Sequence, residues 1–110
     1  MENSPFYTIK EAQFDVTFIL GADDDSDTVE NIDAEVVLAD GTRWSATFLT
    51  LHEISRIMDR WSTTGESLHG AYFQCPDLVI TRKGGIDAMV DVLREMIETG
   101  GPEGKLGKLT

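Results

Sequence analysis

The first clear pattern along the chain is an alternation of apolar and polar residues from Phe14 to Leu20. Aromatic and β-branched residues dominate this segment, and most of its apolar side chains fall on every second position. Period 2 is the spacing of a strand with one buried face, here the face of Phe14, Val16, Phe18 and Leu20. Gly21 ends the predicted strand.

A hairpin is predicted next, from two β-rich runs at residues 34–38 and 42–49. Asp40 and Gly41 lie between the runs, and an Asp-Gly pair suits the positive φ angles of a type I′ turn. A two-residue loop would place Trp44, Ala46 and Phe48 on one face. It would also set two cross-strand pairs: Val37 with Trp44, and Glu35 with Ala46.

Two later segments have the apolar spacing of amphipathic helices. The first extends from about Leu51 to Trp61 and begins with the capping box Thr50-Leu51-His52-Glu53, in which the threonine oxygen and the glutamate each accept from an N-terminal amide. The second follows Gly84-Gly85 and stops at Gly100-Gly101-Pro102. Its apolar residues recur at i, i+3, i+4 and i+7: Ile86, Met89, Val90, Leu93, Met96 and Ile97.

The remaining segments are less regular. Residues 70–81 are predicted to be extended, as one strand or as two, because Pro76 cannot donate to a ladder and interrupts the runs 71–74 and 77–81. Residues 22–33 have the composition of a surface loop. Residues 101–110 are predicted to be a loose C-terminal tail.

This order of elements predicts a single α+β domain over residues 1–110. A mainly antiparallel sheet of four to five strands would have one open face, and two amphipathic helices would pack on it. The length and the apolar fraction of 41% are those of one domain with a real core.

The charge is distributed unevenly along the chain. The formal net charge is -11, and residues 1–40 contain eleven acidic side chains but one basic side chain, Lys10. Residues 41–110 contain nine acidic and eight basic side chains. Such a field repels nucleic acid and anionic membranes and attracts basic proteins. The alternative interpretation is that the acids form a solvated face that keeps the protein soluble.

The acidic loop invites a comparison with calcium-binding loops. Asp23, Asp25 and Asp27 have the spacing of the first three EF-hand ligands. The position that needs glycine is Thr28, however, and the position that needs a bidentate glutamate is Ala34. We therefore expect no dedicated calcium site.

Other catalytic and metal-binding patterns are weak. Cys75 precedes a proline in a strand-like region, and neither His52 nor His69 is placed by the sequence as its base. One cysteine and two histidines make no zinc pattern, so no catalytic residue, metal site or cofactor is predicted. Lys83-Gly84-Gly85 lacks the strand–loop–lysine order of a phosphate loop and predicts a turn before a helix.

The aromatic residues divide between the core and a surface. Trp61 falls on the apolar stripe of its helix and is predicted to pack in the core, whereas Trp44 and Tyr72 are candidate interface anchors. Together with the acids, they form the predicted partner-binding set: Asp23, Asp24, Asp25, Asp27, Glu30, Asp33, Glu35, Trp44 and Tyr72.

The size, the acidity and the stretches Trp44-Ser45-Ala46-Thr47-Phe48 and Tyr72-Phe73 resemble small bacterial immunity proteins. Those proteins neutralise toxins of contact-dependent growth inhibition and related polymorphic toxin systems. The resemblance covers about residues 34–99 and implies a tightly bound cognate toxin and no catalysis. A nuclease toxin would suit an acidic inhibitor, because its nucleic-acid cleft is basic.

Two alternatives remain open from the sequence. One is a small enzyme or ligand-binding domain whose site is built from scattered residues, which this kind of fold can accommodate. The other is a regulatory subunit that oligomerises through a hairpin edge.

The sequence also gives an expectation for location. Residues Met1–Ser4 contain no basic region leading into an apolar one, and no apolar stretch approaches the length of a membrane span. The single cysteine excludes an intramolecular disulfide. We expect a cytoplasmic protein that binds neither membranes nor nucleic acid.

Overall fold

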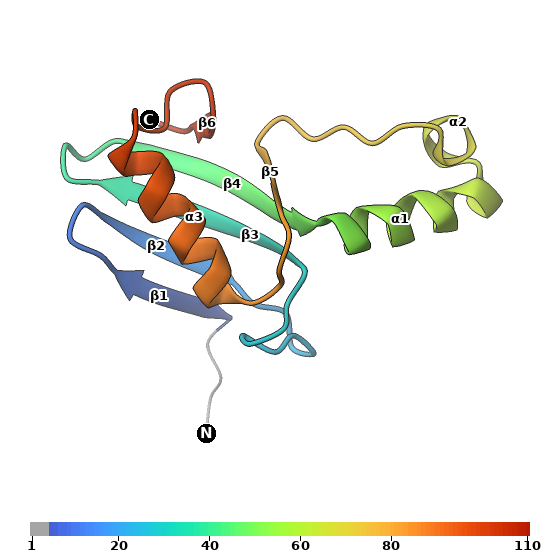
Figure 1. The fold of residues 1–110 in the computed structure, drawn as a ribbon, viewed down its shortest axis with the longest axis horizontal. Coiled ribbons are helices and arrows are strands. Elements are labelled where there is room, and N and C mark those ends of the chain that lie inside the picture. The colour runs from blue at the N-terminus through green and yellow to red at the C-terminus, as the bar shows by residue number, and fades with distance from the viewer. Residues whose placement is uncertain (1–4) are drawn as a thin grey trace.

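A twisted six-stranded sheet with one helix lying across it forms the body of the protein (Figure 1). The computed structural model describes residues 5–110, so the N-terminal residues used for the signal-peptide expectation lie outside it. The predicted α+β class is confirmed. The strands are β1 (Phe6–Lys10), β2 (Phe14–Ile19), β3 (Asn31–Leu38), β4 (Arg43–Thr50), β5 (Leu78–Thr81) and β6 (Gly107–Lys108).

The sheet is mainly antiparallel, as predicted. Its order is β1-β2-β3-β4-β5, with β6 paired to β4 beside β5. Only the β4–β5 pair is parallel among the strands of residues 5–110. This arrangement leaves β1 at one edge and the short strands β5 and β6 at the other.

Helix α3 (Ile86–Glu98) covers one face of the sheet (Figure 1). The side chains facing it include Phe14, Val16 and Phe18 of β2, which are buried as the alternation predicted. Leu20, just past the strand, is half-buried against the same core. The rings of Phe18 and Phe48 lie 6.1 Å apart at a tilt, an arrangement that aromatic pairs favour.

The predicted hairpin is present between β3 and β4, but its register differs by one residue. Val36 lies opposite Trp44, where Val37 was predicted. The loop has three residues rather than two, because Gly41 adopts a φ of 86° and donates to Leu38 O, in the manner of a turn closed by a bulge. A shift of one residue exchanges the two faces of a strand, so Val36 is buried and Glu35 faces outward.

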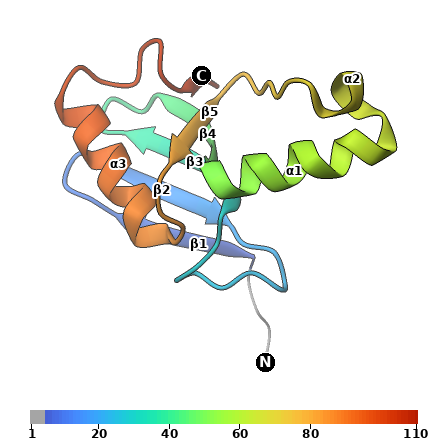
Figure 2. The ribbon, with the colours of Figure 1, turned by 45° about the vertical axis from the view of Figure 1, so that its right-hand side comes forward.

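Helix α1 (Leu51–Thr64) begins at the predicted cap and runs farther than predicted. Thr50 Oγ1 accepts from the Glu53 amide at 3.0 Å, but the Glu53 carboxylate pairs with Arg56 instead of reaching back. Half of the capping box therefore forms. Figure 2 shows that α1 continues away from the end of β4, so α1 projects from the sheet while α3 covers it.

The segment after α1 returns along it, so that the two form an arm (Figures 1 and 2). α2 (Glu66–Gly70) is a single turn in which Ser67, Leu68 and His69 have positive φ. Residues 71–77, which follow it, are not a strand, and this corrects the prediction for 71–74. Phe73 stacks on Trp61 with ring centroids 5.6 Å apart. Packing against α1 thus replaces pairing in the sheet, which this segment rejoins at Leu78.

The prediction of a loose C-terminal tail is wrong. Pro102 and Leu106 are buried, and β6 pairs with Trp44 and Ser45 of β4. The Arg43 amide also donates to the carbonyl of Thr110. Burial of Leu106 and these ladder bonds fix residues 101–110 along the edge of the sheet. Of the helices within residues 5–110, none is both long and apolar enough to cross a membrane.

Candidate partner-binding surface

The acidic loop between β2 and β3 is ordered by its own hydrogen bonds. Because β3 begins at Asn31, the loop is shorter than the predicted 22–33. Asp24 Oδ2 accepts from the Gly21 amide at 2.8 Å, and Asp25 Oδ1 accepts from the Asp27 amide at 2.7 Å. Side chains of this type stabilise turns by bonding to nearby backbone amides. The loop therefore has a defined shape.

The loop is also fixed to the start of α3. The Gly85 amide donates to Val29 O and the Ile86 amide donates to Ser26 O, both at 2.8 Å. A side chain at Gly85 would meet Asp27 O at 2.5 Å, and its φ of 96° is one that favours glycine. Val29 is buried in the main core. The Gly84-Gly85 pair, predicted as a turn before a helix, thus also packs closely against the acidic loop.

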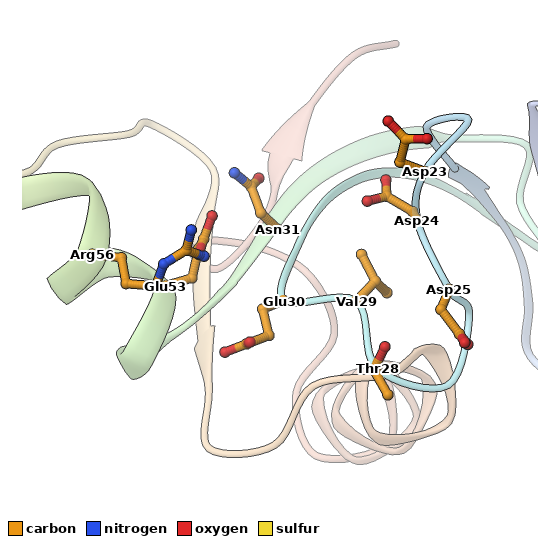
Figure 3. Close-up of a pocket in the computed structure, with 9 residues that line it drawn as sticks. All are labelled: Asp23, Asp24, Asp25, Thr28, Val29, Glu30, Asn31, Glu53 and Arg56. Carbon is orange, nitrogen blue, oxygen red and sulfur yellow. The ribbon is translucent and has the colours of Figure 1, made fainter. Parts of the chain in front are cut away.

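A shallow polar depression of about 250 Å³ separates this loop from the first turns of α1 (Figure 3). The acids of the loop lie on one side of it, and Glu53 and Arg56 lie on the other. The Arg56 guanidinium is already paired with Glu53. The residues that line the depression are Asp23, Asp24, Asp25, Thr28, Val29, Glu30, Asn31, Glu53 and Arg56.

The four loop aspartates are exposed and carry uncompensated charge. Within residues 5–110, no lysine, arginine or histidine lies within ion-pair distance of their carboxylates. Asp24 and Asp25 accept backbone amides, whereas Asp23 and Asp27 have no side-chain hydrogen bond in that part of the chain. The loop therefore presents negative charge on a fixed backbone: Asp23, Asp24, Asp25 and Asp27.

Glu30 has a structural role instead. It is half-buried, and its Oε1 accepts from Thr50 Oγ1 at 2.6 Å and lies 3.0 Å from His52 Nδ1. The hydrogen bonds from Thr50 and His52 lower the pKa of Glu30 below its ordinary value, although burial opposes them. Glu30 therefore links the start of β3 to the start of α1.

Asp33 and Glu35 lie apart from the loop, on the face of the sheet opposite α3. Glu35 forms an ion pair with Arg43 across the hairpin. Asp33 is exposed and accepts from Thr47 Oγ1 at 3.1 Å. The predicted acidic set is thus divided between the loop and this open face.

The two predicted aromatic anchors have different outcomes. Trp44 is 5% exposed and belongs to the core, which contradicts its prediction as an interface anchor. Its Nε1 donates to Thr42, and the ammonium of Lys108 lies 5.7 Å from its ring centroid. Tyr72 is 49% exposed, but its segment returns along α1, on the other side of that helix from the acidic loop (Figure 1). Tyr72 is therefore not brought together with the loop acids.

Asp77 is a further carboxylate with several side-chain hydrogen bonds, and the sequence did not predict them. Ser45 Oγ donates to Asp77 Oδ2 at 2.7 Å, while Thr47 Oγ1 and the Cys75 thiol donate to Oδ1. Burial raises the pKa of Asp77, but these hydrogen bonds outweigh it and hold the pKa below its ordinary value. The hydroxyls come from β4, thirty or more residues away, and no local spacing indicated the contact.

Cys75 and His52 are not paired with each other as a nucleophile and its base. Cys75 donates to Asp77 and His52 contacts Glu30, so the two are engaged separately. Within residues 5–110, no group of three or more histidine, cysteine or acidic side chains is arranged to hold a metal ion. Comparison with protein-family models, curated proteins and solved structures gave no match.

Proposed function

We propose that this protein is a non-catalytic binding module whose acidic loop recognises a basic protein. One observation carries the proposal: the loop aspartates are exposed and unpaired within the described chain, on a backbone held by α3 and the core. A fixed loop loses little conformational freedom on binding, so its interactions contribute more fully to affinity.

Electrostatics supports this choice of partner. Clustered carboxylates raise the local concentration of a cationic protein and accelerate its association. The same carboxylates repel one another, and this repulsion destabilises the folded state. A surface that merely solubilises does not require the loop to be seated so closely on Gly85.

More specifically, we propose that the protein is a cytoplasmic immunity protein that neutralises a basic, nuclease-type toxin. The loop would occupy the basic cleft in which the toxin holds the phosphate backbone of its substrate. Two features support this form: the exposed loop charge, and the resemblance of size and acidity noted from the sequence.

The adjacent gene and its product test both the general proposal of a basic partner and the specific proposal of a toxin inhibitor. A neighbouring gene for a large secreted protein with a variable C-terminal domain is expected, whereas a metabolic operon there would overturn the toxin-inhibitor form. Nuclease activity of that C-terminal domain should be inhibited by the purified protein. The inhibition should weaken when Asp23, Asp24, Asp25 and Asp27 are changed together to asparagine.

A matched variant controls for net charge. Asp59, Glu66, Glu98 and Glu103 are exposed acids outside the loop, and their amide variants remove the same four charges. Asparagine keeps an oxygen that can accept from the Gly21 and Asp27 amides, so the loop variant should stay folded. Equal inhibition by the two variants would show that the loop is solubilising surface only.

A further inference from the structure

The outer edge of β1 presents main-chain groups of Thr8 and Lys10 that β2 does not use. β1 is the terminal strand of the sheet, and within residues 5–110 it pairs with β2 alone. The Leu20 amide donates to Pro5 O and the Glu11 amide donates to Phe14 O, which fixes the alternation of the ladder between them. By this alternation, the amides and carbonyls of Thr8 and Lys10 point away from β2.

Aromatic side chains flank this edge on both faces. Phe6 and Tyr7 are 59% and 45% exposed, and Phe6 lies opposite Ile19, which is 49% exposed. The Phe6–Ile19 pair is of the non-hydrogen-bonded kind, in which the side chains of opposite residues lie closest. The edge therefore combines outward main-chain groups with an exposed apolar pair.

This apolar pair adjoins the acidic loop. Ile19 is the last residue of β2, and two residues later the Gly21 amide donates to the Asp24 carboxylate. An extended segment paired along β1 would thus have negative charge beside the end at Phe6.

We propose that β1 accepts a strand from the basic partner, an extended segment that alternates apolar and cationic side chains. Such strand addition gains affinity from main-chain hydrogen bonds and specificity from alternate side chains. The apolar side chains would pack on Phe6 and Ile19, on the face of the sheet opposite α3. The cationic ones would lie on the α3 face, where the acidic loop is held at the start of that helix. This inference rests on the proposed function, because the negative charge of the acidic loop is the reason to expect a basic segment at this edge.

The same charge disfavours a second copy of the chain as the occupant. With a net charge of -11, two copies paired edge to edge would bring like fields together.

The test uses two synthetic probes of about six residues, the ordinary length of a strand. One alternates valine with lysine, and the other alternates valine with glutamate. Binding is measured by titration, and hydrogen exchange is followed at the backbone amides. The lysine peptide should protect the amides of Thr8 and Lys10, and the glutamate peptide should bind at least about tenfold more weakly.

A proline substitution isolates the edge hydrogen bonds. Thr8→Pro removes an outward amide that β2 does not use, and edge positions of this kind tolerate proline. Thr8→Val keeps the amide but, like proline, loses the 3.0 Å contact between the Thr8 and Thr17 hydroxyls. The lysine peptide should bind Thr8→Pro about tenfold more weakly than Thr8→Val.

The outcomes separate the two proposals. Equal binding to both Thr8 variants, with no protection of Thr8 and Lys10, would overturn strand addition and leave the acidic-loop proposal intact. Equal binding of both peptides would instead overturn the basic partner. Protection that rises with protein concentration without peptide, with a dimer in sedimentation, would identify a second copy as occupant. If Thr8→Pro does not fold, amide protection in the unmodified protein still decides.

Discussion

At the scale of single residues, Gly85 connects the acidic loop to the fold. Its φ is 96°, its amide bonds to Val29 O, and its α-carbon lies so close to the loop that an added Cβ would meet Asp27 O at 2.5 Å. Gly41 has a similar φ of 86°, but a Cβ there would meet nothing within 4 Å. A comparison of the two glycines therefore separates the cost of a side chain at positive φ from the cost of close packing.

Gly85→Ala should destabilise the protein more than Gly41→Ala. Gly41→Ala should cost roughly 1 kcal/mol for its positive φ alone, and Gly85→Ala about 1–3 kcal/mol more, because Asp27 must move. Chemical denaturation measures both, and faster hydrogen exchange at Ile86 would report loss of the loop contact. Equal costs would indicate that the loop is only loosely seated.

Asp77 makes stability depend on pH in a defined direction. Because its pKa is lowered in the folded state, its contribution is present above its unfolded pKa of about 3.9 and is lost as the pH falls through the lower folded pKa. Asp77→Asn should therefore be less stable than the unmodified protein at pH 7. The difference in unfolding free energy should shrink toward pH 3; a constant difference would contradict the assignment.

At the scale of elements, the residues with strong local signals were predicted and those determined by distant contacts were not. The alternation of Phe14, Val16 and Phe18 identified the buried face of β2, and Thr50 identified the start of α1. The register of the hairpin depended on the conformation of Gly41, which an Asp-Gly pair does not determine uniquely. β1, at the edge and mostly exposed, gave no pattern strong enough to predict it.

The candidate site shows the same division. Sequence position alone placed Asp23 to Asp27 on one loop, and the structure keeps them together. Trp44 was assigned to a surface because its residue type is common at interfaces, yet the hairpin register turns it into the core. The hydroxyl partners of Asp77 come from β4, and no local spacing could have indicated them.

The C-terminal segment offers a test at this scale. Leu106 is 7% exposed and belongs to the core cluster, whereas Leu109, three residues later, is 46% exposed. Leu106→Ala should lower the unfolding free energy by about 2–4 kcal/mol, and Leu109→Ala by about 0.5 kcal/mol or less. A negligible effect of Leu106→Ala in chemical denaturation would restore the prediction of a loose tail.

At the scale of the whole molecule, the exposed carboxylates of the acidic loop lie at one end of the sheet. The acidic loop follows β2 there, β1 begins beside it, and the first turn of α1 faces it across the depression (Figures 1 and 3). The arm formed by α1 and its return segment projects from the body on the far side of that depression. A basic partner approaching this end would meet both the loop and the outer edge of β1.

Salt dependence of association tests this picture most directly. Stopped-flow rate constants for binding of the neighbouring toxin domain are measured from about 0.05 to 0.5 M salt for the unmodified protein, the loop variant and the matched charge control. The rate constant of the unmodified protein should fall at least about tenfold across this range. The loop variant should associate more slowly with a shallower slope, and the control should stay close to the unmodified protein. Identical rates and slopes for the two variants would contradict recognition through the acidic loop.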